Sequence, residues 1–305
     1  MVAAAMAGSV AIGIDLGGTK ILAGVVAEDG AVLRSVEHGT PLDSQDAIMA
    51  ALEDVVDELL DDEIRAVGLG VPLILDPVTR VAFHATNLPV ENLDIVGRIA
   101  RRFGLPAAID NDGNVATLAE WRLGAGRGVR DMVMLTLGTG VGGGLILAEH
   151  LYSGWAEIGH VVVEADGPPC QGTCHGRGHL EGLVSGTAAD GVAERLYGPK
   201  ADARTLLERA REGRPEAVAE LERMGHLLGV GVGSFVNLFF PDVVVVGGGF
   251  GMAAGELLLA PARAAARREA VHPGDERIVI VPAALGETAG LIGAALVGLA
   301  AVDGL

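Results

Sequence analysis

The chain has 305 residues, of which 50% are hydrophobic and 20% charged, a balance typical of globular proteins and unlike that of disordered ones. Its 22 basic and 40 acidic residues give a formal net charge of −18, which argues against a nucleic-acid partner or an anionic membrane surface. Two cysteines are too few for a disulfide framework and favour a reducing compartment, so we expect a cytoplasmic protein. We expect neither a signal peptide nor a membrane span, because the first nine residues are too short and no apolar run is long enough.

Two apolar runs joined by a glycine-rich link open the chain, at residues 10–15 and 21–27. The pattern predicts a β-hairpin whose turn is Gly17-Gly18-Thr19-Lys20. Such a turn leaves backbone N–H groups uncovered, and this shape receives phosphate even in an acidic protein. It is not a Walker A loop, because that loop has Gly-Lys-Ser/Thr before a helix, whereas here threonine precedes lysine and a strand follows.

Apolar runs and helical periodicity predict alternating strands and helices along the rest of the chain, which indicates an α/β fold. Strands are expected at residues 31–36, 66–71, 105–109, 132–137, 144–148, 243–246 and 277–281. Helices are expected at residues 45–60, 115–123, 182–197, 202–211, 215–238 and 288–302.

A second glycine-rich turn, at residues 138–143, formally matches the dinucleotide-binding fingerprint. We reject that interpretation because an apolar strand follows, where the fingerprint requires a helix. With a shift of 121 residues, Leu137–Gly138 aligns with Leu16–Gly17 of the first hairpin. The sequence therefore predicts a duplicated fold with two phosphate-facing hairpins.

Polar residues follow the strand expected at residues 105–109, in the stretch 110–114, which reads Asp-Asn-Asp-Gly-Asn. Asp and Asn are the preferred helix caps, so capping alone is the simplest interpretation. One cap needs one such residue, however, and this stretch supplies four. A carboxylate at the end of a strand and beside a helix N-terminus is also well placed to meet a substrate.

Residues 157–181 form a polar segment, rich in glycine and proline, in an otherwise apolar chain. Glycines separate Cys170, Cys174 and His179, so the loop can fold back and let its donors converge. The segment also contains His160 and His175, and this set of thiolate and imidazole donors predicts a tetrahedral zinc site, with either His175 or His179 as a ligand. A surface loop with incidental thiols and imidazoles is the competing interpretation.

Five motifs in order resemble the ROK (repressor, open reading frame, kinase) family, which belongs to the hexokinase/actin-like ATPase superfamily. They are DLGGTK at 15–20, DNDGN at 110–114, LTLGTGVGGG at 135–144, EIGH at 157–160 and a Cys/Gly/His loop ending in Leu-Glu at 180–181. The resemblance runs from about Val10 to the C-terminus. It implies an α/β, two-domain actin-like ATPase/hexokinase fold of the ribonuclease H-like type, with a cleft between the domains. We expect the smaller domain at residues 1–114 and 289–305, and the larger domain, with its zinc loop at 157–181, at residues 115–288.

The resemblance also implies site residues and cofactors. Asp112 resembles the general base that takes the proton from the sugar hydroxyl. The implied sugar ligands are Asn87, Asn111, Asp112, Glu157, His160 and Glu181. The implied ligands of ATP and Mg²⁺ are Asp15, Gly17, Gly18, Thr19, Lys20, Thr139, Gly140 and Gly248. The implied ligands of a structural Zn²⁺ are His160, Cys170, Cys174 and His179, so His160 would bind zinc through one ring nitrogen and sugar through the other.

The chain departs from the family pattern at two places. The family's zinc loop is C-x-C-G-x-x-G-C, whereas this chain has three residues between Cys170 and Cys174 and ends the set with His179. The family also has Pro-Gly after the strand that ends here at Val71, where this chain has Pro72–Leu73. That glycine lets the backbone approach the sugar, so Leu73 bears on which sugar is bound.

The expected reaction is the phosphorylation of glucose by ATP to glucose 6-phosphate, the entry of glucose into glycolysis. N-acetylmannosamine, fructose and allose are alternative substrates, because their kinases use the same motifs. A non-catalytic sugar-sensing ROK protein is a further alternative, but pure binding needs no base such as Asp112. The two phosphate hairpins argue against a purely structural zinc protein.

Other partners can also be anticipated. ROK repressors carry an N-terminal helix-turn-helix segment, and only nine residues precede the first expected strand, so we expect no DNA-binding extension. We expect a homo-oligomer, either a dimer or a tetramer, with a small-molecule sugar as its substrate.

Overall fold

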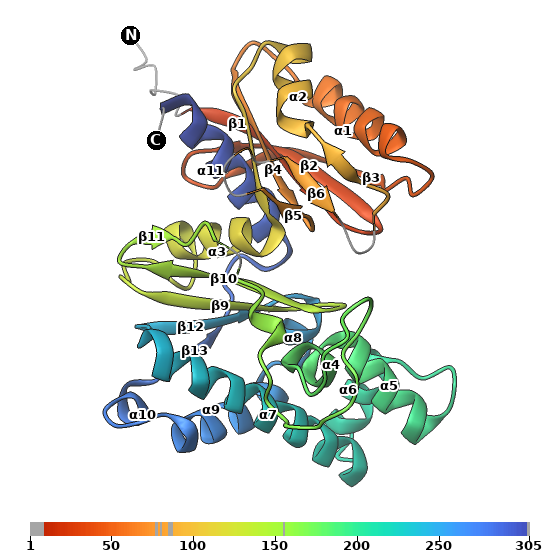
Figure 1. The fold of residues 1–305 in the computed structure, drawn as a ribbon, viewed down its shortest axis with the longest axis vertical. Helices are drawn as coiled ribbons and strands as arrows, with labels where there is room; N and C mark the ends of the chain where they lie inside the picture. Colours follow the sequence, from red (N-terminus) through yellow and green to blue (C-terminus); the bar gives the residue numbers. More distant parts are fainter. Residues whose placement is uncertain (1–8, 77–78, 80, 85–87, 155, 304–305) are drawn as a thin grey trace. The chain divides into compact units, whose positions relative to one another are not determined.

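The structure is a computed structural model that describes residues 9–76, 79, 81–84, 88–154 and 156–303. The chain divides into two compact units, which are residues Met1–Ala119 with Thr288–Leu305 (unit 1) and residues Glu120–Glu287 (unit 2). Each unit combines a β-sheet with helices (Figure 1), so the predicted α/β class is confirmed. Among the described residues, no helix is both long and apolar enough to cross a membrane.

Unit 1 is built on a five-stranded sheet with the order β3-β2-β1-β4-β8. Its strands are β1 (Val10–Leu16), β2 (Lys20–Ala27), β3 (Val32–Gly39), β4 (Ile64–Val71) and β8 (Ala107–Asn111). β1 pairs antiparallel with β2 and parallel with β4, which confirms the first predicted hairpin. A smaller sheet joins β5 (Ile74–Leu75), β6 (Ala82–His84) and β7 (Glu91–Leu93).

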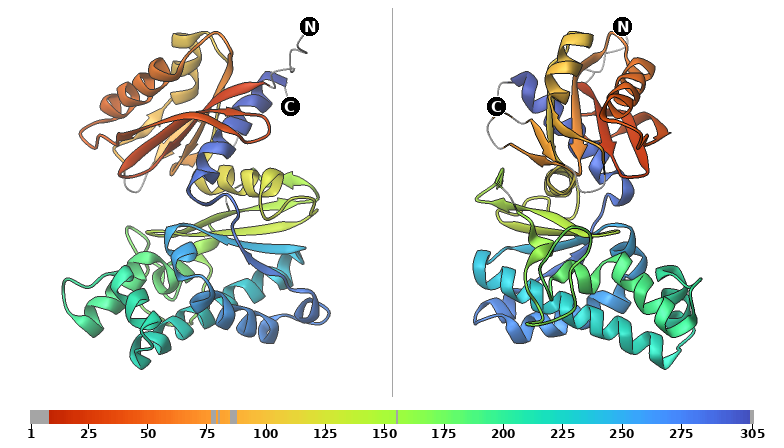
Figure 2. Two further views of the ribbon diagram at one scale, coloured as in Figure 1. Left: turned by 180° about the vertical axis from the view of Figure 1, so that it is seen from behind. Right: turned by 45° about the vertical axis from the view of Figure 1, so that its right-hand side comes forward.

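Helices cover both faces of the five-stranded sheet (Figures 1 and 2). One face carries α1 (Gln45–Leu59) and α2 (Ile95–Phe103), and the other carries α11 (Ala289–Asp303). Alternation along β1 explains the two faces, because Ile12 and Ile14 are buried in the core with α1 and Gly13 between them faces α11. A β-carbon at Gly13 would lie 2.9 Å from Ala295 N, so α11 approaches the strand this closely only because the residue is glycine.

Unit 2 repeats the strand order of unit 1, with a five-stranded sheet arranged β11-β10-β9-β12-β13. The strands are β9 (Met132–Leu137), β10 (Val141–Leu147), β11 (His150–Leu151), β12 (Val243–Gly247) and β13 (Ile280–Pro282). In both sheets the first three strands are antiparallel and the next two run parallel to the central strand. The predicted duplication is therefore confirmed, and so is the rejection of the dinucleotide fingerprint, because the second glycine-rich turn leads into a strand.

The core of unit 2 lies between its sheet and a layer of helices. Valines of β9 and β12 share one apolar cluster with Leu228 and Val232 of α7 and with Leu258 of α9. The helices are α3 (Asp112–Leu123), which begins in unit 1, α4 (Leu180–Val184), α5 (Gly186–Tyr197), α6 (Ala203–Arg211), α7 (Pro215–Phe239), α8 (Gly249–Ala254), α9 (Glu256–Glu269) and α10 (Gly274–Arg277). Two short 3₁₀ helices are η1 (Ile158–His160) and η2 (Gly286–Thr288).

Several predicted elements have other bounds in the structure, and two of these differences have a clear local cause. The helix expected at 182–197 is two helices, because the buried Ser185 is extended and caps α5 by accepting a hydrogen bond from Ala188 N at 3.1 Å. The strand expected at 277–281 begins only at Ile280, because Arg277 ends α10, whose first turn carries Asp275 and Glu276 as helix N-termini favour. Eight elements have no counterpart among the elements predicted from the sequence, namely α2, α8, α9, α10, β5, β6, β7 and β11.

Candidate functional site

The turn of the first hairpin is held by backbone contacts and open on its outer side. Gly17 N donates to Lys20 O at 2.8 Å, and Thr40 Oγ1 donates to Gly17 O at 2.7 Å. A β-carbon at Gly18 would meet no atom within 4 Å, so the space above this turn is open. The Lys20 ammonium pairs with Glu37 at 3.0 Å on the neighbouring strand. The predicted phosphate-binding residues of unit 1 are therefore together in one braced and accessible turn.

Asp15 lies one residue before the end of β1 and is half-buried. Burial and the nearby Asp112 carboxylate raise its pKa to about 6, against a smaller lowering by Lys20. A β-carbon at Gly290 would lie 2.3 Å from Asp15 Oδ2, so this carboxylate rests on the first turn of α11. Two neighbouring carboxylates are hard oxygen donors of the kind that Mg²⁺ takes, so the residues present fit the implied ion.

The Asp-Asn-Asp-Gly-Asn stretch contains one internal brace and two outer side chains. Asp110 Oδ1 accepts hydrogen bonds from Asn111 N at 2.7 Å and from Asn114 Nδ2 at 2.9 Å, and both Asp110 and Asn114 are buried. Asn111 Oδ1 and Asp112 Oδ1 both accept from Gly113 N, at 2.9 Å and 2.8 Å. Asp110 and Asn114 thus fix the shape of the turn, while the proposed base Asp112 and Asn111 stand together at the start of α3.

The second hairpin is fixed from the side of α4 and α5. Gly138 O accepts from Gly186 N at 2.7 Å, and Thr139 O accepts from Thr187 Oγ1 at 2.8 Å. Glu181 Oε2 accepts from Val141 N at 3.0 Å, so this carboxylate of α4 lies directly beside the turn. The predicted phosphate hairpin and the proposed sugar ligand Glu181 are therefore neighbours in the structure, although they lie far apart in the sequence.

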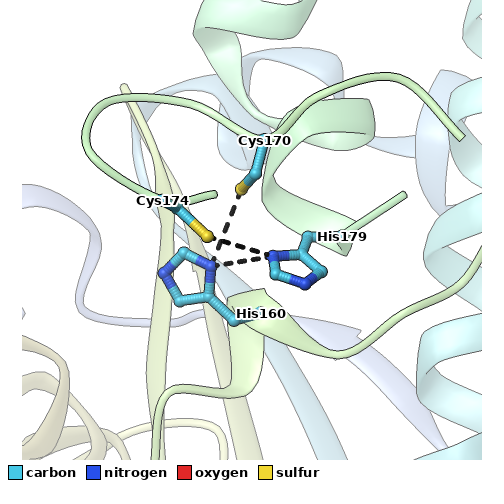
Figure 3. Close-up of side chains that lie close together, drawn as sticks. All are labelled: His160, Cys170, Cys174 and His179. Carbon is cyan, nitrogen blue, oxygen red and sulfur yellow. Dashed lines mark hydrogen bonds between the residues drawn. The ribbon is translucent and has the colours of Figure 1, made fainter. Parts of the chain in front are cut away.

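Four predicted metal ligands converge in unit 2, as Figure 3 shows. The ligand atoms of His160, Cys170, Cys174 and His179 all lie within 4.8 Å of one another, and all four side chains are half-buried. The two histidine Nδ1 atoms are 3.2 Å apart, Cys170 Sγ lies 3.6 Å from His160 Nδ1, and Cys174 Sγ lies 3.5 Å from His179 Nδ1. His175 is exposed and lies outside this group.

These separations fit zinc. Tetrahedral zinc, with Zn–N bonds of about 2.05 Å and Zn–S bonds of about 2.3 Å, separates two nitrogens by roughly 3.3 Å and a nitrogen from a sulfur by roughly 3.6 Å. Burial, with smaller contributions from Cys174 and Glu181, raises the pKa of the Cys170 thiol to about 11, and a bound cation would reverse this. Both imidazoles direct Nδ1 into the cluster, which leaves Nε2 of His160 for another ligand.

The remaining predicted residues have varied surroundings. Glu157 is exposed beside the buried Ile158, and its carbonyl accepts from His160 N at 3.0 Å, which fixes the Glu-Ile-Gly-His turn. Gly248 has a φ of 79°, and a β-carbon there would lie 2.5 Å from the backbone of Leu137. Asn87 lies outside the described residues. Leu73, which replaces a family glycine, is only 3% exposed and belongs to the core of unit 1.

A cavity of about 700 Å³ in unit 2 was not predicted as a whole. It is lined by Gly138, Thr139, Gly186, Thr187, Asp190, Ala203, Arg204, Leu207, Glu208, Arg211, Gly249, Phe250 and Ala253. It therefore extends from the second hairpin, beside Gly248, to α5, α6 and α8. The Gly-Gly-Gly sequence at 247–249 was the available signal, but nothing in the sequence indicated that α5 and α6 form the opposite wall.

Comparisons with known proteins agree with this arrangement of hairpins and sheets. The model of the ROK family matches residues 11–300, a range that includes both glycine-rich hairpins and both five-stranded sheets apart from Val10, the first residue of β1. The chain belongs to the ROK family, and the predicted membership is confirmed. A glucokinase from Thermotoga maritima is 34% identical, over 93% of this chain and 95% of the relative.

Two solved structures share both sequence and fold with the chain. A ROK family glucokinase from Streptomyces griseus, in complex with glucose and AMPPNP, is 33% identical with a TM-score of 0.82, over 95% of this chain and 99% of that one. A ROK hexokinase from Thermus thermophilus is 34% identical with a TM-score of 0.83, over 97% of this chain and 100% of that one. The predicted hexokinase-like fold is therefore confirmed.

Proposed function

We propose that this chain is an ATP-dependent hexose kinase that phosphorylates glucose to glucose 6-phosphate. The observation that carries this proposal is that each unit presents a braced glycine-rich hairpin and that unit 1 adds the carboxylates Asp15 and Asp112, in a chain that matches glucokinases over nearly its whole length. Phosphoryl transfer needs positioning and charge stabilisation more than covalent chemistry, and these groups supply both.

Asp112 is the proposed general base, which takes the proton from the sugar hydroxyl as that oxygen attacks the terminal phosphate of ATP. Its position at the start of α3 is supported by the hydrogen bond from Gly113 N to Oδ1. Asn111 is the proposed neighbouring sugar ligand in unit 1, and Glu157, His160 and Glu181 are the proposed sugar ligands in unit 2. Carboxylate, amide and imidazole groups suit vicinal hydroxyls because each makes more than one hydrogen bond.

The nucleotide is assigned to the two hairpins and the cavity beside the second one. The open space above Gly18 supports a phosphate position over the first turn. The cavity lined by Thr139, Phe250 and Arg204 supports a nucleoside position in unit 2. Mg²⁺, when bound by Asp15, neutralises charge on the transferring phosphate, and Lys20 adds a nearby positive charge.

Zinc is proposed as a structural ion held by His160, Cys170, Cys174 and His179. Two thiolates and two neutral imidazoles balance the charge of Zn²⁺, and four protein ligands leave no open position for catalysis. The ion would fix the ring of His160, whose Nε2 then serves as a hydrogen-bonding group toward the sugar. Through the loop it would also fix Glu181, whose Oε1 lies 3.9 Å from Cys170 Sγ.

A coupled assay that detects ADP, run with ATP, Mg²⁺ and each of glucose, N-acetylmannosamine, fructose and allose, tests the proposed function. Glucose is expected to give the highest kcat/KM. The burial of Leu73 in the core of unit 1 supports an unobstructed sugar position despite the missing glycine. Binding of a sugar without ADP production would favour the sugar-sensing alternative.

We also propose a cytoplasmic location and a homo-oligomer. Two free cysteines within a candidate metal site support a reducing compartment, because oxidation would compete with metal binding. The product, glucose 6-phosphate, would enter glycolysis. A dimer or a tetramer is testable by light scattering of the purified protein.

A further inference from the structure

Glu120 is a completely buried carboxylate to which the proposed reaction gives no role. It lies on α3 and has 0% exposure. Its Oε2 accepts hydrogen bonds from Ala125 N at 2.8 Å and from Ala284 N at 3.0 Å, and its Oε1 accepts from Leu285 N at 2.7 Å. Burial of a carboxylate is strongly unfavourable unless hydrogen bonds replace its water, and three backbone N–H groups do so here.

The bonds of Glu120 join two segments that are 164 residues apart in sequence. Both segments lie close in sequence to the unit boundaries, which fall between Ala119 and Glu120 and between Glu287 and Thr288. Ala284 and Leu285 directly precede η2 and α11, whereas Glu120 belongs to α3. One carboxylate therefore fixes the segment directly before η2 and α11 to the second half of α3.

Each of the two carboxylates of the proposed reaction lies next to one of the elements that Glu120 adjoins. α3 begins at Asp112, and Asp15 Oδ2 rests on the first turn of α11 at Gly290. The helices touch directly, because a β-carbon at Gly293 would lie 1.8 Å from Val115 O. A shift of the segment before α11 would thus move the support of Asp15 relative to Asp112.

We infer that Glu120 is a positioning residue of the phosphoryl-transfer site, which holds the segment directly before α11 against α3 and so limits movement of Asp15 relative to Asp112. The inference rests on the proposed function. Small displacements of reacting groups cost rate more than affinity, because transfer requires a narrowly defined geometry. Loss of the Glu120 hydrogen bonds should therefore lower kcat and leave KM values almost unchanged.

Glu120→Gln is a nearly isosteric test. A Gln amide has only one oxygen, so it can accept either the two bonds that Oε2 now accepts, from Ala125 and Ala284, or the one that Oε1 accepts, from Leu285. At the remaining position its NH₂ group faces a backbone N–H donor, and that hydrogen bond is lost. Gly124→Ala is a second variant, and it leaves the charge of Glu120 in place. Its β-carbon would lie 2.1 Å from Glu120 Oε2 and would therefore displace the carboxylate. Glu53→Gln is the matched control, since Glu53 is 8% exposed but binds Arg98 and Arg102 far from these segments in sequence.

We expect kcat for glucose to fall at least ~10-fold in Glu120→Gln and in Gly124→Ala, with KM values for glucose and ATP within about 3-fold of the wild type. Glu53→Gln should keep kcat within about 2-fold of the wild type, even if its melting temperature falls as much as that of the Glu120-directed variants. Hydrogen exchange at residues 284–291 should accelerate in the two Glu120-directed variants and not in the control.

An unchanged kcat together with a lowered melting temperature in both variants would reduce Glu120 to a stabilising role and overturn the inference. Gly124→Ala decides alone if Glu120→Gln does not fold. A wild type that phosphorylates no hexose would contradict the proposed function, and the exchange measurement would still decide whether Glu120 holds this segment. Unchanged exchange at residues 284–291 overturns the inference whatever the substrate is.

Discussion

The carboxylate of Glu181 lies against Gly140, where a β-carbon would stand 2.4 Å from Glu181 Oε2. The same oxygen accepts the hydrogen bond of Val141 N at 3.0 Å. Gly140 is therefore needed to leave room for the Glu181 carboxylate, apart from any role in binding phosphate. This differs from Gly18 in the first hairpin, where an added β-carbon would meet no atom within 4 Å.

The two glycines should consequently differ when each is changed to alanine. Gly140→Ala should displace Glu181 and raise the glucose KM about 10-fold or more, because a hydrogen bond to a charged group contributes roughly 1.5–3 kcal/mol. Gly18→Ala should raise the KM for ATP and leave that for glucose unchanged. Steady-state kinetics with each substrate varied in turn measures both effects. If Gly140→Ala altered only the KM for ATP, Glu181 would not be a sugar ligand.

Asp112→Asn should lower kcat by about 10²–10⁴-fold, the usual contribution of a general base. The amide keeps the oxygen that accepts the Gly113 N–H, so the start of α3 should remain intact. Glucose affinity, measured by calorimetry, should change far less than kcat. A variant with nearly normal turnover would remove Asp112 from the role of base.

Asp15 should make the ligand-free protein less stable as the pH rises. Its pKa is raised from 3.8 to about 6 by burial, so folded chains hold a proton that unfolded chains release between these values. Wild-type stability should therefore fall between about pH 4 and pH 6 relative to Asp15→Asn, by up to roughly 3 kcal/mol at 1.36 kcal/mol per pH unit. Urea unfolding of both proteins at pH 4, 5, 6 and 7.5 measures the difference. A stability difference between the two proteins that stays constant from pH 4 to pH 7.5 would contradict the raised pKa of Asp15.

Elemental analysis of chelator-washed protein should find one tightly held zinc per chain. His179→Ala and Cys174→Ser should lose that ion, because each removes one of four converging ligands. His175→Ala is the matched control in the same loop and should retain it, because His175 is exposed and outside the cluster. Zinc lost from the His175 variant and retained by the His179 variant would show that the ligand set is different.

Local patterns predicted both hairpins and every strand of the two five-stranded sheets except β11, but they missed the smaller sheet of β5, β6 and β7. The run from Met132 to Leu137 is a strand with the predicted bounds, and the repeated glycine-rich turns indicated the duplication that the strand orders confirm. The helix break at Ser185 was not predicted, because it depends on a cap whose alternative, a continuous helix, has the same apolar spacing. Periodicity alone cannot distinguish these two outcomes.

Contacts between distant segments were beyond the reach of sequence reasoning. The convergence of His160 with the loop of Cys170, Cys174 and His179 could be anticipated, because the four residues are close in sequence and offer the imidazole and thiolate ligands that zinc prefers. Glu120 could not, because a glutamate in a helix is usually solvent-exposed and its partners are backbone N–H groups of a segment near residue 285. Backbone donors carry no signature in the sequence.

The central claim is that this chain transfers the terminal phosphate of ATP to O6 of glucose with Asp112 as the base. The most direct test is ³¹P NMR of a reaction with glucose, ATP and Mg²⁺, run with the wild type and with Asp112→Asn in parallel. We predict that the wild type forms glucose 6-phosphate and ADP in equal amounts and that the variant forms neither at a comparable rate. Release of inorganic phosphate without a sugar phosphate, or equal rates of glucose 6-phosphate formation by both proteins, would contradict the claim.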